Sequence, residues 1–452
     1  MNRFLLVVLL IMLASFSTKA QQYRVNYLPN DLDVLEDYLE HINDTFIDNI
    51  EGKHSSKVKK VFKKKDEKIF RTVKDSAYSF IPAIDQKMGA IAQEIYQKNP
   101  SINPANYQFF IKNSIVPNAA CYGDGMFEVN LGLLTSLEYD DELAFILCHE
   151  IAHKLLNHSM KKVKARVTTL NSDETKQRIR KLKRTRYGQS RAALLVMNEL
   201  SVDFLNHSQE AEMQADSLGF VLLSKTKYNT SKSISSLRKL QREEDDLFFS
   251  YRVQLDSVFD HESYPFQEYW LEEEQSLFDV SEKINDFTST SKDIKTHPET
   301  EERIQKIKSD FKLNSLDSIS GDTTYIKSLE EIANFHSIQY TIDLNFLDLA
   351  IYQLIEKYDR KIISEEYYYT KMASVLKILY EARENHHLGK YIPHKNNLSE
   401  EEHLNTIRLF LHNLELSEIK KIGWAFCETH QEKLAHHQDF MQTYQFFKNL
   451  NP

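Results

Sequence analysis

The sequence predicts an α+β fold that is mostly α-helical, and three observations support it. Glycine is scarce, with 10 in 452 residues, and 27% of the residues are charged, a composition that favours helices over turn-rich β architecture. Apolar residues recur at helical spacing along most of the chain. Only residues 107–129 have the pattern of short strands around glycine turns. We therefore expect a domain with one small sheet, followed by a purely helical domain.

The first residues have the pattern of an export signal. Arg3 precedes an apolar run from Phe4 to Phe16, and small residues follow as far as Ala20. This order is typical of a signal peptide, so we expect residues 1–20 to be removed and the protein to be periplasmic or secreted. The run of about 13 residues is short for a bilayer, and an uncleaved membrane anchor is the alternative. No later stretch predicts an integral membrane span in the mature chain.

Charge and cysteine usage exclude several classes of protein. The net charge of -9 and the pI near 6.0 give no overall reason to expect nucleic acid. Residues 161–191 contain 12 Lys or Arg, and we interpret them as a solvated helical insertion rather than a nucleic-acid patch. The three cysteines, Cys121, Cys148 and Cys427, are too few for a disulfide scaffold.

The remaining pattern suggests the order of the domains. Residues 28–99 look helical, with a basic stretch at 57–68 that interrupts them, and Asp140 or Asp141 can cap the helix that follows the strands. Ser399 and Glu402 predict a capping box in the C-terminal part. We expect a catalytic domain over 21–310, a linker over 311–324 and a helical domain over 325–452, either repeat-like or a plain bundle.

A metal-binding pattern lies on the helix predicted at residues 143–156. His149 and His153 are four residues apart, so both imidazoles face the same side of a helix. Glu150, next to the first His, then lies beside the open position of a bound ion. Two His ligands and a carboxylate that takes a proton from metal-bound water are the arrangement of zinc hydrolases, with one Zn²⁺ per chain.

Zinc needs a third protein ligand, and Glu212 is the better candidate. Glu212 and Asp216 are four residues apart on a second amphipathic helix, so one can bind zinc while the other accepts the N–H of a ligating His. His158 is the nearby alternative. On a continuous helix it lies about 180° round from His149, so we expect it to face away.

At this point the sequence resembles a known family. The motifs are similar to those of the gluzincin zinc metallopeptidase family that holds HtpX, the CaaX prenyl proteases and periplasmic BepA-type peptidases. The resemblance covers residues 107–308. It rests on four ordered motifs: Asn118 and Ala119 with the glycine turn and the segment Val129 to Leu134; His149 to His153; Glu212 with Asp216 and Gly219; and Thr296, His297 and Pro298 with Arg303.

The resemblance implies a gluzincin-type catalytic domain and a role for each motif. His149, His153 and Glu212 would ligate zinc, and Asp216 would orient a ligating His. Glu150 would act as the general base. His297 would stabilise the oxyanion or occupy the open position of zinc in a latent state. Two further roles are implied: Arg303 would support the oxyanion or Glu212, and the strand at Asn118 and Ala119 would bind the substrate backbone.

Together these observations predict an exported zinc metalloendopeptidase. Its substrates would be unfolded or misfolded polypeptides, its setting would be envelope protein quality control, and its C-terminal helices would bind a protein partner. Two alternatives remain open. One is a chaperone-like binding protein with a latent zinc site, and the other is a membrane-anchored protease that keeps its first helix.

Overall fold

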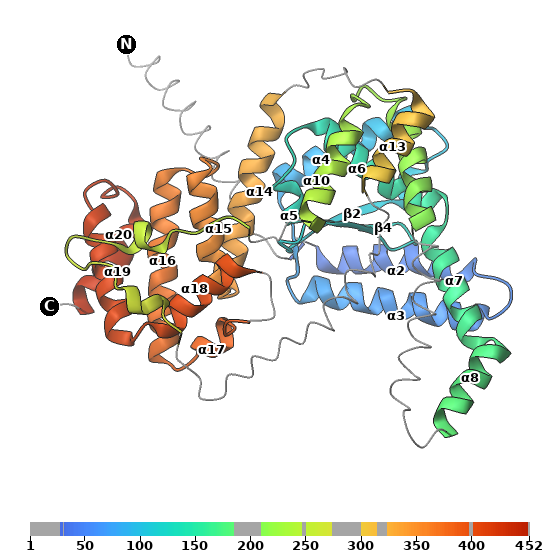
Figure 1. The fold of residues 1–452 in the computed structure, drawn as a ribbon. Helices are drawn as coiled ribbons and strands as arrows, with labels where there is room; N and C mark the ends of the chain where they lie inside the picture. Colours follow the sequence, from blue (N-terminus) through green and yellow to red (C-terminus); the bar gives the residue numbers. More distant parts are fainter. Residues whose placement is uncertain are drawn as a thin grey trace, which may run out of the picture. The chain divides into compact units, whose positions relative to one another are not determined.

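The computed structural model divides the chain into two compact units (Figure 1). Unit 1 comprises residues 1–242 and 282–330, and unit 2 comprises residues 243–281 and 331–452. The catalytic domain expected over 21–310 included residues 243–281, which instead form part of unit 2. The structure describes residues 28–29, 31–184, 209–245, 250–273, 300–313, 323–396 and 401–450, so the predicted signal peptide, most of the predicted linker and Ser399 lie outside the described residues.

Two long helices open unit 1. They are α2 (Leu32–Asp48) and α3 (Ser55–Lys74), which pack against each other. The sequence suggested that the basic stretch at 57–68 interrupts the helical region. It does not, because this stretch belongs to α3. Val58, Phe62, Ile69 and Val73 are buried on one side of this helix, at intervals of four and seven residues. The apolar stripe therefore holds α3 to the core while the lysines face solvent.

A four-stranded sheet lies against these helices. Its order is β1-β2-β4-β3, with β2 and β4 parallel and β3 antiparallel to β4 at one edge. β1 and β3 are therefore the edge strands, and each has one side that pairs with no other strand of the sheet. The strands are β1 (Tyr78–Ser79), β2 (Gln108–Lys112), β3 (Ala119–Cys121) and β4 (Met126–Asn130), with the short 3-10 helix η1 (Pro104–Asn106) before β2.

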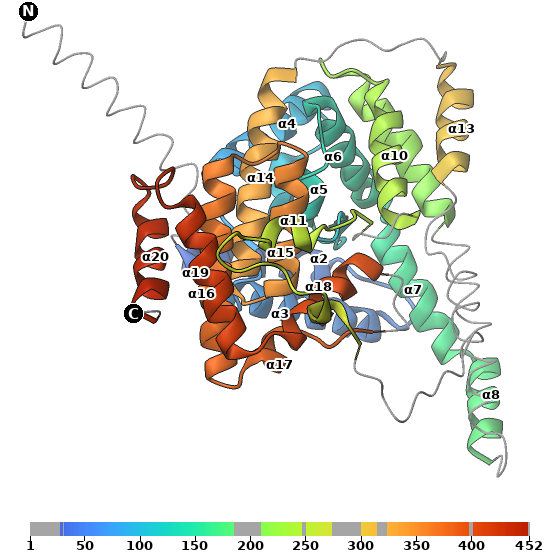
Figure 2. The ribbon, with the colours of Figure 1, turned by 60° about the vertical axis from the view of Figure 1, so that its left-hand side comes forward.

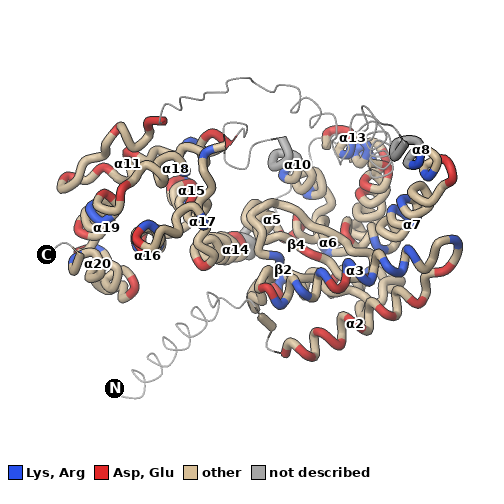
Figure 3. The backbone as a smooth tube through the Cα atoms, turned by 90° about the horizontal axis from the view of Figure 1, so that it is seen from below, with Lys and Arg blue, Asp and Glu red and all other residues tan. Residues whose placement is uncertain are grey.

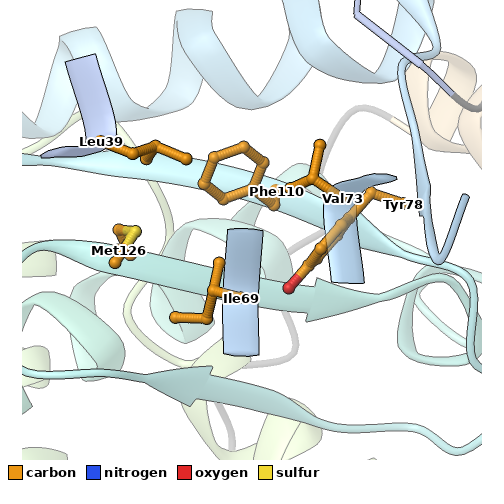
Figure 4. Packing of buried hydrophobic residues seen from close by; sticks show 6 residues of the cluster. All are labelled: Leu39, Ile69, Val73, Tyr78, Phe110 and Met126. Atoms are coloured by element: carbon orange, nitrogen blue, oxygen red, sulfur yellow. The ribbon is translucent and has the colours of Figure 1, made fainter. Parts of the chain in front are cut away.

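Helices cover both faces of the sheet (Figure 1). On one face, α2 and α3 pack on the strands through one hydrophobic cluster, which Figure 4 shows: Leu39, Ile69, Val73, Tyr78, Phe110 and Met126. On the other face lie α4 (Pro82–Lys98) and α6 (Asp140–Leu155), which pack against each other. The helix with the predicted metal ligands is thus a central element of the core.

The start of α6 is fixed by a buried carboxylate. Glu142 is fully buried and accepts hydrogen bonds from the backbone N–H groups of Glu138 and Tyr139, so the capping residue is not Asp140 or Asp141. Glu142 also accepts from Lys239 at 2.8 Å. The other helices of unit 1 are α5 (Leu131–Leu134), α7 (His158–Asn171), α8 (Asp173–Arg184), the helical residues 209–223, α10 (Lys232–Asp245) and α13 (Thr300–Phe311).

Unit 2 is helical, as the sequence predicted, and Figure 2 shows its helices packed side by side. Segment 250–273 is anchored to it by Trp270, whose Nε1 donates to Glu418 at 2.9 Å, and by Phe259, which stacks on Phe410. The elements of unit 2 are α11 (Leu255–Phe259), η2 (Glu268–Leu271), α15 (Leu347–Asp359), α16 (Glu365–Glu384), α17 (Leu388–Tyr391), α18 (Glu402–Asn413), α19 (Leu416–His430) and α20 (Gln438–Leu450). Helix α14 (Thr323–Asp343) precedes α15.

None of the helices in the described part of the chain combines the length and the apolar character needed to cross a bilayer.

Candidate metal centre

Helix α6 brings the two predicted His ligands together. His149 and His153 are four residues apart, and their Nε2 atoms lie 3.0 Å from each other. His149 is buried, and His153 is partly buried. The spacing of one helical turn thus turns both rings toward one point, as the sequence predicted.

The helical residues 209–223 supply the third predicted ligand. Oε2 of Glu212 lies 3.4 Å from Nε2 of His149, and Oε1 lies 3.4 Å from Nε2 of His153. Gly219 explains why this helix can approach so closely. A Cβ atom added at Gly219 would lie 3.1 Å from both Cα and N of His149, so a larger residue would separate the two helices.

The two imidazole nitrogens and the carboxylate of Glu212 fit a zinc ion. Ligand atoms in a tetrahedral site with bonds of about 2.0–2.2 Å lie about 3.3–3.6 Å apart. The distances of 3.4, 3.4 and 3.0 Å between the three side chains are close to that spacing. Two imidazoles and one carboxylate are also a donor set that Zn²⁺ prefers. The predicted ligands therefore have both the chemistry and the spacing of a zinc site.

The charges around His149 favour a cation at the same place. Burial lowers the pKa of His149, but hydrogen bonds with Asp216 and Glu212 outweigh it and raise this pKa to about 10. A proton on His149 is thus strongly stabilised by the two carboxylates, which are also positioned to stabilise the positive charge of a metal ion.

Asp216 and Arg303 hold the outer side of His149. Oδ1 of Asp216 lies 2.9 Å from Nδ1 of His149. The guanidinium of Arg303 donates to both oxygens of Asp216, from Nε at 2.7 Å and from Nη2 at 2.8 Å. Burial raises the pKa of Asp216, but Arg303 and His149 outweigh burial and lower it. Asp216 is therefore an anion, so His149 presents Nδ1–H to it and Nε2 to the ion.

Arg303 lies on the side of Glu212 and Asp216. Its Nη2 is 3.5 Å from Oε2 of Glu212, and the side chain is 5% exposed. Of the two places that the family resemblance suggested, the structure thus shows the one against Glu212. His297, from the same motif, lies outside the described residues.

We expected His158 to face away from the metal centre, and this prediction is wrong. Its Nδ1 lies 2.9 Å from Nδ1 of His153, and its Nε2 lies 3.2 Å from Oε1 of Gln214. The reason is that α6 ends at Leu155 and Asn157 has a left-handed backbone with φ of 55°. Burial, followed by the neighbouring His153, lowers the pKa of His158 to about 4, so its ring is neutral at neutral pH.

Glu150 is buried beside the ligands. It follows His149 on α6 and is 6% exposed. Burial is the largest influence on its pKa, which is raised despite the neighbouring His149 and His153. A raised pKa suits a carboxylate that must take up a proton near neutral pH and release it again.

The edge strand β3 leaves part of its backbone open. Asn118 accepts from the N–H of Asn130 on β4, so the backbone groups of Ala119 and Cys121 point to the free side. There the side chain of Asn118 accepts from the N–H of Ala119, and Ser159 donates to the C=O of Cys121. The C=O of Ala119 and the N–H of Cys121 have no partner among the described residues.

Unit 2 contains another group of potential ligands. Glu366, His436 and His437 bring their donor atoms within 4.8 Å of one another. However, the side chain of Glu366 is 56% exposed, and its Oε2 is 4.0 Å from Nε2 of His437. The group in unit 1 is better formed because its ligands are largely buried and held by partners of their own.

The comparisons with known proteins agree with this geometry. The sequence model of Peptidase family M48 matches residues 82–310, which is just over half of the 452 residues. The matched range begins at α4 and ends in α13, so it includes the sheet and the three candidate ligands. A search of the curated proteins finds no match to the chain.

Proposed function

This chain belongs to peptidase family M48, and we propose that it is an exported zinc-dependent metalloendopeptidase. Membership of the family makes it a metalloprotease with polypeptide substrates. The observation that carries the choice of zinc is the convergence of His149, His153 and Glu212, whose donor atoms have the spacing of a tetrahedral site.

His149, His153 and Glu212 would hold the ion, leaving its fourth position open. When bound, zinc lowers the pKa of water to about 7 and polarises a carbonyl group. Asp216 and His158 keep the Nδ1 sides of the two imidazoles engaged, so both Nε2 atoms face the ion. Arg303 balances the negative charge of Asp216 and Glu212.

Glu150 would move the proton in the reaction. It accepts a proton from the water that attacks the peptide carbonyl, and it returns the proton to the nitrogen of the leaving amine. Its buried position beside His149 and its raised pKa support both steps. The family resemblance gives His297 a role at the oxyanion or at the open position in a latent state.

The free side of β3 would bind the substrate as an added antiparallel strand. The C=O of Ala119 and the N–H of Cys121 flank Ala120, so they can pair with the two substrate residues on either side of the one opposite Ala120. Backbone hydrogen bonds of this kind tolerate varied side chains. This fits an endopeptidase that acts on unfolded or misfolded chains.

Export and a role in envelope quality control rest on the sequence. The basic flank, apolar run and small-residue exit before Gln21 favour removal of residues 1–20. Sequencing the N-terminus of the mature protein tests this, because a chain that still starts at Met1 favours the anchored alternative.

One experiment tests the zinc peptidase. Bound metal and casein cleavage are measured together for the unaltered protein, Glu150→Gln and Glu212→Ala. We expect Glu150→Gln to keep zinc and lose cleavage, and Glu212→Ala to lose most of both. Glu366→Ala is the matched control from the second ligand group and should keep both.

Three results would contradict the proposal. Full zinc occupancy in Glu212→Ala would show that another residue is the third ligand. Unchanged cleavage by Glu150→Gln would show that Glu150 is not the general base. Unchanged cellular activity of a Glu150→Gln variant that no longer cleaves would favour a binding protein whose zinc site is latent.

A further inference from the structure

Positive charge is concentrated on three helices, of which α7 follows the ligand-bearing helix α6 directly. α3 carries nine basic and two acidic residues, α7 carries four basic and no acidic residues, and α8 carries six basic and two acidic residues. The whole chain, by contrast, has a net charge of -9. Most of these basic residues for which the structure describes the side chain are exposed. We call the exposed Lys and Arg residues of the three helices the basic face; Figure 3 marks the Lys and Arg positions of α3 and α7 in blue along the backbone.

Packing makes α3 and α7 one continuous surface. Ile50, Val58, Phe62 and Val167 form a buried cluster between them, and Lys57 donates to Asn171 at the end of α7. α8 follows α7 directly and packs against it. The charges are therefore collected on one side of unit 1 rather than scattered.

Few of the basic residues of α3 and α7 have an ion-pair partner in the part of the chain that the structure describes. Among the described residues, the basic residues of α7 form no ion pair, and those of α3 form one, between Lys74 and Glu36. So many like charges repel one another, and the repulsion is relieved when a polyanion binds.

The basic face begins at the C-terminal end of β3, where an antiparallel substrate strand would start. Ser159, in the first turn of α7, donates to the C=O of Cys121 at the end of β3, and Lys65 of α3 lies over the ring of Tyr122, the next residue. β3 runs toward this point. A substrate strand antiparallel to β3 therefore has its N-terminal side at the basic face.

We propose that the basic face docks acidic segments of the polypeptide substrate, on the N-terminal side of the bond that is cleaved. The inference rests on the proposed peptidase function and names a substrate class for it. A bilayer surface is a weaker fit, because the exposed large apolar side chains described on α3 and α7 are limited to Val61 and Leu170. A flexible acidic peptide needs no apolar anchor.

The test compares peptides that share one cleavable core and differ in the flank before it, which is rich in Glu, neutral or rich in Lys. At low ionic strength we expect kcat/KM to be on the order of tenfold higher for the Glu flank than for the Lys flank. The difference should shrink at a salt concentration of about 0.5 M, where screening is strong.

A pair of charge-reversed variants locates the effect. Lys161→Glu with Lys164→Glu should bring the ratio of kcat/KM for the acidic and neutral peptides close to one. Lys98→Glu with Lys225→Glu makes the same charge change at exposed sites away from the basic face and should keep the ratio. An equal effect of both pairs would overturn the docking site and leave only net charge.

Binding without cleavage separates this inference from the proposed function. Fluorescence anisotropy of the labelled acidic peptide is measured on Glu150→Gln, with and without the α7 reversals. If no peptide is cleaved by the zinc-loaded protein but the α7 lysines still control binding, the peptidase proposal fails and the docking surface stands. Equal binding of the peptides with Glu and Lys flanks overturns the docking surface. A protein that binds anionic phosphatidylglycerol vesicles but does not prefer the acidic peptide also overturns it.

Discussion

Nδ1 of His158 lies 2.9 Å from Nδ1 of His153, which places a neutral imidazole directly behind a candidate zinc ligand. Oε1 of Gln214 can only accept, so Nε2 of His158 must donate to it. Nδ1 of His158 is then the acceptor, and Nδ1 of His153 carries the proton. The chain of contacts from Gln214 thus leaves Nε2 of His153 with a lone pair for the metal.

This arrangement predicts that His158 contributes to metal affinity. Replacing His158 by Leu removes the acceptor, and we expect zinc affinity to fall about 10- to 100-fold. His158→Asn keeps a short acceptor and should lose less. Competition with a chromophoric chelator measures both, with His403→Leu in unit 2 as the control. Equal affinities of His158→Leu and the unaltered protein would show that His153 needs no such partner.

The ion pair of Arg303 and Asp216 predicts a large loss of stability when one partner is removed. Both side chains are buried, and Arg303 donates two hydrogen bonds to the carboxylate. Arg303→Met leaves a buried anion without its cation, so the free energy of unfolding should fall by about 3–5 kcal/mol. Adding Asp216→Asn removes the unbalanced charge and should recover part of the loss. Denaturant unfolding of the two variants checks this, and strictly additive losses would contradict it.

Much of the site could be predicted from the sequence because its logic is local. The spacing of His149 and His153, and of Glu212 and Asp216, needs only the helical repeat. The contact of His158 was missed because the same repeat does not hold beyond the end of α6, where Asn157 turns the chain. The Asn before His158 was the sequence signal for the end of the helix, since Asn is among the residues that most readily adopt a left-handed backbone.

The fold was predictable to a similar extent, and for similar reasons. The helices and the small sheet follow from apolar periodicity. In α3, however, only Val58, Phe62, Ile69 and Val73 show the stripe among many lysines, so the basic stretch looked like an interruption. The assignment of residues 243–281 to unit 2 depends on contacts distant in sequence, such as Trp270 with Glu418, which no local pattern contains.

Gly219 sets the distance between the two ligand-bearing helices, and its replacement should affect both stability and metal binding. In Gly219→Ala the new Cβ would lie 3.1 Å from the backbone of His149, so the helices must move apart by a few tenths of an ångström. We expect a loss of about 1–3 kcal/mol in the free energy of unfolding and weaker zinc binding.

Gly89 provides the matched control. It is exposed in the middle of α4, and a Cβ there would meet no atom within 4 Å. Gly89→Ala should leave zinc binding unchanged and stabilise the protein by up to about 1 kcal/mol, because Ala has the higher helix propensity. Thermal unfolding and zinc titration of the two variants distinguish close packing from propensity. Zinc binding that is equally strong in both would show that the spacing at Gly219 does not matter.

Asp66 predicts a pH dependence of stability that is separate from the metal centre. Burial, and next the nearby Asp124, raise the pKa of Asp66 to about 6, although Asn43 donates to its carboxylate at 2.6 Å. The ordinary pKa in an unfolded chain is about 3.9. Ionised Asp66 therefore destabilises the folded state above about pH 6, and this cost disappears as the pH falls below about 4.

The isosteric change Asp66→Asn isolates this contribution. Above about pH 7 the variant should be more stable than the unaltered protein, by about 1 kcal/mol or less because the side chain is partly exposed and screened by solvent. At about pH 3, below both pKa values, both folded and unfolded states of the unaltered protein carry a largely neutral Asp66, so the advantage should vanish. Thermal unfolding at the two pH values measures it. An advantage that grows as the pH falls would mean that Asp66 is stabilised as an anion, and that its pKa is lowered rather than raised.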